Sequence, residues 1–210
     1  MLADPKKHWR PGKSAYELAR AWEDAQGSDR GLPASVAAAC DASPATASAY
    51  LVLGLPELQV EMPGKGRLSQ TDLWALLRTD SGLVSMAVEG KAGEPFGPLV
   101  SSWLEGLPSD SNRHGRLARL AETIGVDPDK CGDLRYQLFH RTVSAIRMAE
   151  RCRATAAALL VHAFGGEGDE DSRADFEAFC RLLGATTTPG VLSPTSTRSQ
   201  VPLLVGWVDG

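Results

Sequence analysis

The sequence predicts an α/β fold, with a mixed central sheet of about five strands flanked by helices. Short apolar runs bounded by polar or turn residues have the length and pattern of strands. Longer segments with apolar residues three and four positions apart have the pattern of amphipathic helices. The predicted order is a helical start, a group of three strands, helices, a strand, a helix and a last strand.

Residues that cap helix N-termini help to locate the predicted helices. Ser14 and Glu17 have the spacing of a capping box. Asp133 and Ser172 are the residue types that cap helices, and each precedes a later helical segment. We expect helices at Ala15–Gln26, Pro33–Cys40, Leu99–Leu107, Arg116–Ile124, Leu134–Arg153 and Ala174–Leu183.

The predicted strands differ in how clearly they are bounded. Gly54 and Pro56 should interrupt the first one, whereas Ala157–Phe164 is a continuous apolar run typical of a buried central strand. We expect strands at Leu51–Leu53, Leu58–Met62, Leu73–Leu77, Leu83–Val88, Ala157–Phe164 and Leu203–Val208. We expect a single domain over residues 1–210, with a helical part at 1–50 and, at 51–210, the core with a C-terminal α-β extension.

Two of these strands should form a hairpin that brings ionisable residues together. Residues 79–82 (Thr-Asp-Ser-Gly) have the composition of a tight turn. If the hairpin folds about the bond between residues 80 and 81, Asp72 faces Glu89 directly on one face of the sheet. Like charges repel there, but a divalent cation reverses that effect because it takes carboxylate oxygens as ligands. Lys91 lies two residues beyond Glu89 and shares its face. Such a group predicts metal-assisted phosphodiester cleavage.

The pattern Asp-x16-Glu-x-Lys on a hairpin resembles the PD-(D/E)xK nuclease-like superfamily. The resemblance implies that Asp72 and Glu89 ligate Mg²⁺ or Mn²⁺, that the main-chain carbonyl of Gly90 adds a ligand, and that Lys91 positions or activates the attacking water. It also implies a restriction-endonuclease-like α-β-β-β-α-β core, which agrees with the predicted order of elements. Thr71 stands where the superfamily has proline.

Three stretches also look like an uncharacterised bacterial domain family. They read HWRPGKSAYELA from His8, SQTDLWALLR from Ser69 and AVEGK up to Lys91. This resemblance spans nearly the whole chain but implies no activity.

Residues on the long helix of the predicted core are candidates for binding substrate. Gln137 and Arg141 are four residues apart and share one helix face, with Tyr136 and His140 on the adjacent face. The resemblance implies that such a helix points a Gln, Tyr or basic residue into the site, where Arg141 would bind a phosphate. A plain polar helix face is the alternative. Glu61 is either a third carboxylate or, as we expect, part of a solvated face.

Two further groups contain histidine. His8, Arg10 and Lys13 surround Trp9 in a basic N-terminal cluster, which either contacts a phosphate backbone or is simply solvated. His162 lies within an apolar strand, so we expect a hydrogen-bonded core histidine there.

Composition limits the cellular compartment and the binding partners that we expect for this protein. No apolar run approaches the ~20 residues of a membrane span, and no apolar segment follows the basic N-terminus as in a signal peptide. The four cysteines are scattered without a C-x2-C pair, so we expect free thiols in the cytoplasm. The net charge of −4 argues against tight binding of long duplex DNA. We expect nucleic acid as the partner of an active nuclease, with a catalytically inactive binding or regulatory module as the alternative. Formation of a homo-oligomer is left open.

Overall fold

The computed structural model describes residues 9–64, 66–166 and 168–210, and its centre is one mixed sheet. The sheet has six strands in the order β1-β2-β3-β4-β6-β5. Neighbours β1, β2 and β3 are antiparallel, β3, β4 and β6 run parallel, and the short β5 is antiparallel to β6. The strands are β1 (Tyr50–Val60), β2 (Ser69–Thr79), β3 (Gly82–Lys91), β4 (Ala156–Ala163), β5 (Ser193–Pro194) and β6 (Leu203–Asp209).

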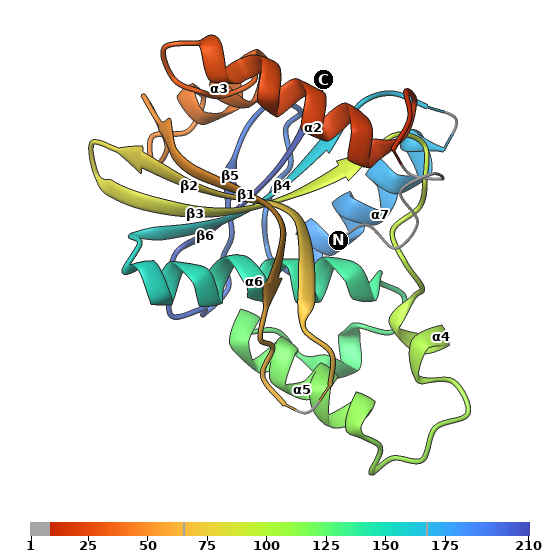
Figure 1. Cartoon of the computed structure of the whole chain (residues 1–210). Coiled ribbons are helices and arrows are strands. Elements are labelled where there is room, and N and C mark those ends of the chain that lie inside the picture. The colour runs from red at the N-terminus through yellow and green to blue at the C-terminus, as the bar shows by residue number, and fades with distance from the viewer. Residues whose placement is uncertain (1–8, 65, 167) are drawn as a thin grey trace.

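Helices cover both faces of this sheet (Figure 1). One face packs against α2 and α3, and the other packs mainly against α5, α6 and α7. The helices are α2 (Ser14–Asp24), α3 (Ala34–Asp41), α4 (Val100–Leu104), α5 (Asn112–Ile124), α6 (Tyr136–Cys152) and α7 (Asp169–Leu182), with 3-10 turns η1 (Ala25–Gly27) and η2 (Pro128–Lys130). The predicted fold class is therefore confirmed, with the two-residue β5 as a strand that we did not expect.

Side chains of the central strands alternate between the two faces. In β4, Ala157, Leu159 and Val161 join the core beneath α5, α6 and α7. Ala158 and Leu160 join the core beneath α2 and α3. Because both faces are covered by helices, β4 is apolar at nearly every position, as expected for a buried central strand.

The β2–β3 hairpin has the predicted register. Arg78 pairs with Leu83, and the ladder continues to Leu73 opposite Val88. The turn requires glycine at position 82, where φ is +137° and a Cβ atom would lie 2.6 Å from the Thr155 side chain. One step beyond the last pair, the same register brings Asp72 and Glu89 opposite one another.

The predictions were wrong about the first strand. β1 runs without interruption through Gly54 and Pro56, with one register shift between Leu51 and Leu53. Proline is tolerated because β1 lies at the edge of the sheet, where its missing N–H need not serve a second neighbour.

The predicted helix caps were wrong as well. α2 begins at Ser14 itself, and the Glu17 carboxylate accepts a hydrogen bond from the backbone N–H of Gly12 at 2.6 Å. α6 begins only at Tyr136, so Asp133 does not cap it. α7 begins at Asp169, and the Ser172 hydroxyl within it donates to the carbonyl of Glu94. This last contact fixes the loop that follows β3. In addition, α4 ends earlier and α5 begins earlier than expected.

The described part of the chain contains no helix long and apolar enough to cross a membrane. All four cysteines are free thiols, as expected.

Candidate functional site

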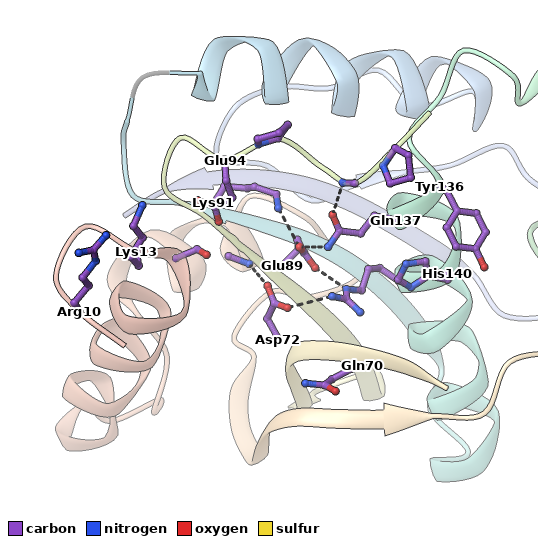
Figure 2. Close-up of a pocket in the computed structure, with 16 residues that line it drawn as sticks. Arg10, Lys13, Gln70, Asp72, Glu89, Lys91, Glu94, Tyr136, Gln137 and His140 are labelled. Atoms are coloured by element: carbon purple, nitrogen blue, oxygen red, sulfur yellow. Dashed lines mark hydrogen bonds and ion pairs between the residues drawn. The ribbon is translucent and has the colours of Figure 1, made fainter. Parts of the chain in front are cut away.

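Strand alternation places the predicted acidic and basic residues on the α6 side of the sheet. In β3, Val84, Met86 and Val88 pack toward α2 and α3. Glu89 and Lys91 therefore point the other way, toward α6, where they meet Asp72 from β2 (Figure 2). The apolar alternate positions thus determine which face carries the charges.

Glu89 is the most enclosed of these groups, with 2% of its side chain exposed. Its Oε1 accepts hydrogen bonds from Lys91 Nζ at 3.1 Å and from Gln137 Nε2 at 2.5 Å. Its Oε2 accepts one from Arg141 Nε at 2.6 Å. Two cations and one amide therefore hold this carboxylate in a fixed orientation.

Asp72 is more open, with 28% of its side chain exposed. Its Oδ2 accepts a hydrogen bond from the backbone N–H of Gly90 at 3.1 Å, and its Oδ1 accepts one from Arg141 Nη2 at 3.1 Å. Arg141 therefore bridges the two carboxylates. Its guanidinium lies between them and offsets the repulsion that the hairpin register would otherwise create.

The two carboxyl groups differ in their affinity for a proton. Enclosure and the nearby Glu89 carboxylate raise the pKa of Asp72 to about 7, against the opposing effects of Arg141 and Lys91. Burial by itself would raise the pKa of Glu89, but Arg141 and Lys91 outweigh it and hold that pKa well below its usual range. Near neutral pH, Glu89 is therefore ionised and Asp72 is partly protonated.

Lys91 is held on two sides. It is 3% exposed, and besides its contact with Glu89 its ammonium lies 4.6 Å from the centre of the Phe96 ring. A cation facing an aromatic ring is stabilised by the ring quadrupole. Phe96 lies on the loop that Ser172 fixes, and no sequence pattern singles it out, because its contact with Lys91 depends on how that loop folds back.

A cleft of about 780 Å³ is lined by Asp72, Glu89 and Lys91. Lys13, which directly precedes α2, and Arg10, three residues earlier, also line it, so part of the basic N-terminal cluster reaches the site (Figure 2). His8 lies outside the described residues. Gln70, which sequence reasoning missed, lines the cleft two positions before Asp72, and the alternation of β2 could have identified it.

Gln137 and Arg141 both lie in the cleft, as the helical spacing predicted. Their neighbours Tyr136 and His140 line it too. His140 Nδ1 lies 2.8 Å from the Ser69 hydroxyl, and burial lowers the pKa of His140 to about 3. This imidazole is therefore neutral near pH 7 and is held by Ser69.

Two other candidates lie away from the cleft. Glu61 forms an exposed pair with Arg151 at 3.4 Å and is solvated, as expected. His162 is a core histidine, because its Nδ1 accepts a hydrogen bond from the Trp22 indole at 3.3 Å and it is fully buried.

The donor set suits a hard divalent cation. Mg²⁺ is commonly bound by one or two carboxylates and keeps several water ligands, which matches a pair formed by Asp72 and Glu89. Gly90, whose carbonyl is the further ligand that the superfamily resemblance implies, lines the same cleft. No group of three or more His, Cys, Asp or Glu side chains with metal-binding geometry occurs within residues 9–64, 66–166 and 168–210. A cation here would therefore depend on the two carboxylates, and Arg141 would have to move aside.

Fold and cleft together define an α/β protein with a paired-carboxylate site. The whole chain, residues 1–210, matches a family described as a domain of unknown function, DUF6946, and it belongs to that family. Neither the curated proteins nor the solved structures include one with significant similarity to this chain.

Proposed function

We propose that this protein is a metal-dependent nuclease that hydrolyses phosphodiester bonds of DNA or RNA. The observation that carries the proposal is the meeting of Asp72, Glu89 and Lys91 in one cleft. Their arrangement is the one that the resemblance to the PD-(D/E)xK superfamily implies. The free thiols are consistent with action in the cytoplasm.

Each residue has a distinct task in this proposal. Asp72, Glu89 and the carbonyl of Gly90 would hold Mg²⁺ or Mn²⁺, which when bound would polarise the phosphate and acidify a water. Lys91 orients that water and offsets the negative charge that develops on the phosphate oxygens. Gln137 and Glu89 fix one another, while Arg141, once released from the carboxylates, provides a planar pair of donors for a phosphate.

A second function is favoured by the position of Arg141. Because its guanidinium bridges Asp72 and Glu89, the carboxylates are compensated without any metal. A binding or regulatory module that retains the fold without catalysis would have this arrangement. The acidic chain, with a net charge of −4, also favours it over an enzyme that acts on long duplexes.

Cleavage of labelled nucleic acid tests the proposal. Single- and double-stranded DNA and RNA would be incubated with the protein at low salt, with Mg²⁺, with Mn²⁺ and with EDTA. We expect metal-dependent cleavage that Asp72→Ala abolishes. Glu61→Ala is the matched control, because it removes an exposed carboxylate outside the cleft. If the wild type cleaves none of these substrates with either ion, the nuclease proposal fails and the binding module remains.

A further inference from the structure

A second hollow, of about 520 Å³, adjoins the carboxylate cleft. Tyr136 and His140 line both spaces, so the two are neighbours across one turn of α6. The other walls come from the connection between β1 and β2, from α4 and from the start of α5. Figure 1 shows that the β1–β2 connection bends away from the sheet to reach α5. We call this space the arginine hollow; its lining residues are Gly66, Arg67, Leu68, Trp103, Asn112, Arg113, Arg116, Tyr136 and His140.

The charge of the arginine hollow is unbalanced. Arg67, Arg113 and Arg116 line it, and no acidic residue in the described part of the chain does. None of these three has a carboxylate within 4.0 Å among the described residues, whereas Arg141 in the adjoining cleft has two. In a chain with a net charge of −4, such a concentration of uncompensated positive charge is a local exception.

Arg116 is the most deeply buried of the three arginines. It is only 8% exposed, and its Nε donates to the Tyr136 hydroxyl at 2.7 Å. Removing a guanidinium from water is unfavourable unless a negative charge compensates it. The backbone also leaves room for this group, because a Cβ atom at Gly66, where φ is +143°, would overlap the Arg116 guanidinium.

Contacts with an aromatic residue also hold Arg113, which lies one turn before Arg116 in α5. Trp103 and Tyr136 stack with ring centres 3.8 Å apart and an interplanar angle of 14°. The Arg113 guanidinium lies 5.3 Å from the Trp103 ring centre and donates to the Trp103 carbonyl at 2.8 Å. Arg113 and Arg116 are thus oriented before any ligand arrives, which lowers the entropy lost on binding.

We propose that the arginine hollow binds a backbone phosphate of the nucleic acid strand whose scissile phosphodiester lies in the carboxylate cleft. The identification of the strand rests on the proposed function. A guanidinium group can donate two parallel hydrogen bonds to two oxygens of one phosphate. Because the two spaces adjoin at Tyr136 and His140, one strand can extend from the first into the second. The hollow thereby supplies the positive charge for strand binding that the overall composition lacks.

Binding without cleavage tests this assignment. A fluorescein-labelled single-stranded 12-mer would be titrated by anisotropy in EDTA at several salt concentrations. The test variant is Arg67→Gln with Arg113→Gln, since both side chains are exposed and neither belongs to the hydrophobic core. The control variant is Arg20→Gln with Arg173→Gln. It also removes two positive charges, but from ion pairs that line neither the cleft nor the hollow.

The expected effect follows from counterion release. For single strands, each phosphate contact contributes about 0.7 to the slope of log affinity against log salt, so loss of the one phosphate held in the hollow should lower the slope of the test variant by about 0.7. If the test variant and the wild type bind equally well at 1 M salt, a slope that is lower by about 0.7 corresponds to roughly eightfold weaker binding at 50 mM salt. The control variant should bind like the wild type.

Several results would overturn the assignment. Equal binding by the test variant and the wild type would do so, as would equal weakening by the test and control variants or no binding of the 12-mer at all. Competition by inorganic phosphate or dTMP as effective as unlabelled 12-mer would instead indicate a site for a free phosphate compound. The two proposals separate cleanly. Strand binding that depends on Arg67 and Arg113 without cleavage refutes the nuclease alone, and cleavage with unaltered binding in the test variant refutes the hollow alone.

Discussion

Replacing Arg141 by glutamine should have opposite effects on the metal-free and metal-bound protein. Without metal, Arg141 is the bridge between Asp72 and Glu89, and it is 9% exposed. Removing one partner of a buried ion pair typically costs about 3–5 kcal/mol. Glu89 keeps Lys91 and Gln137, and Asp72 can take up a proton, so we expect the lower end of that range. At about 2–4 °C for each kcal/mol in a chain of this size, the midpoint should fall by about 6–12 °C.

With metal, the same substitution should be favourable. A divalent cation would compete with Arg141 for the carboxylate oxygens that Arg141 now contacts. A ligand at 100 times its dissociation constant stabilises the native state by about 2.7 kcal/mol. Loss of the competitor lowers that dissociation constant, so Mg²⁺ should raise the midpoint of Arg141→Gln by more than it raises that of the wild type.

Thermal melts with 10 mM Mg²⁺ and with EDTA measure both effects. Arg173→Gln is the matched control, because Arg173 forms a partly exposed pair with Asp209 at 2.7 Å. Such a pair is worth up to about 1 kcal/mol, so this variant should lose little stability and keep the wild-type response to Mg²⁺. If Arg141→Gln were as stable as the wild type in EDTA, or responded to Mg²⁺ no more strongly, the competition described above would not exist.

Three further predictions concern the cleft and the hairpin. Lys91→Ala should abolish cleavage while leaving stabilisation by Mg²⁺ intact, since lysine is no ligand; a variant that cleaves normally would contradict its role. Because the pKa of Asp72 is raised to about 7 in the metal-free fold, its stabilising contribution is full below about pH 4 and is lost as the pH rises through 7. Mg²⁺ affinity in calorimetric titrations should accordingly fall about tenfold per unit below pH 7, and a flat profile from pH 5.5 to 8 would exclude this titration. Gly82→Ala should destabilise the protein by more than about 1 kcal/mol in denaturant titrations, because φ is +137° and Thr155 lies where the Cβ would be; an unchanged midpoint would show that the turn relaxes freely.

The hairpin and its charges were predictable from local sequence. The apolar positions of β2 and β3 must face the cores, and a turn centred on residues 80 and 81 leaves one register that satisfies them. That register fixes Asp72 relative to Glu89 and Lys91. The helical spacing of Gln137 and Arg141 likewise predicted that one face would carry both.

What the sequence did not reveal depends on contacts between distant segments. Arg116 and Gly66 are fifty residues apart, and only the bend of the β1–β2 connection brings them together. Phe96 meets Lys91 because Ser172 holds the intervening loop. The capping box at Ser14 and Glu17 matched a local pattern, but α2 begins one residue earlier and Glu17 serves Gly12 instead. Local pattern alone cannot decide among such partners.

Mn²⁺ binding, followed by electron paramagnetic resonance of the free ion, tests the central claim most directly, because it requires no knowledge of the substrate. Wild-type protein and Asp72→Asn would be titrated at pH 8, above the raised pKa of Asp72. The account predicts one Mn²⁺ site in the wild type, weakened at least tenfold in Asp72→Asn and unchanged in Glu61→Gln. Equal binding by the wild type and Asp72→Asn, or no binding by the wild type at millimolar Mn²⁺, would contradict it.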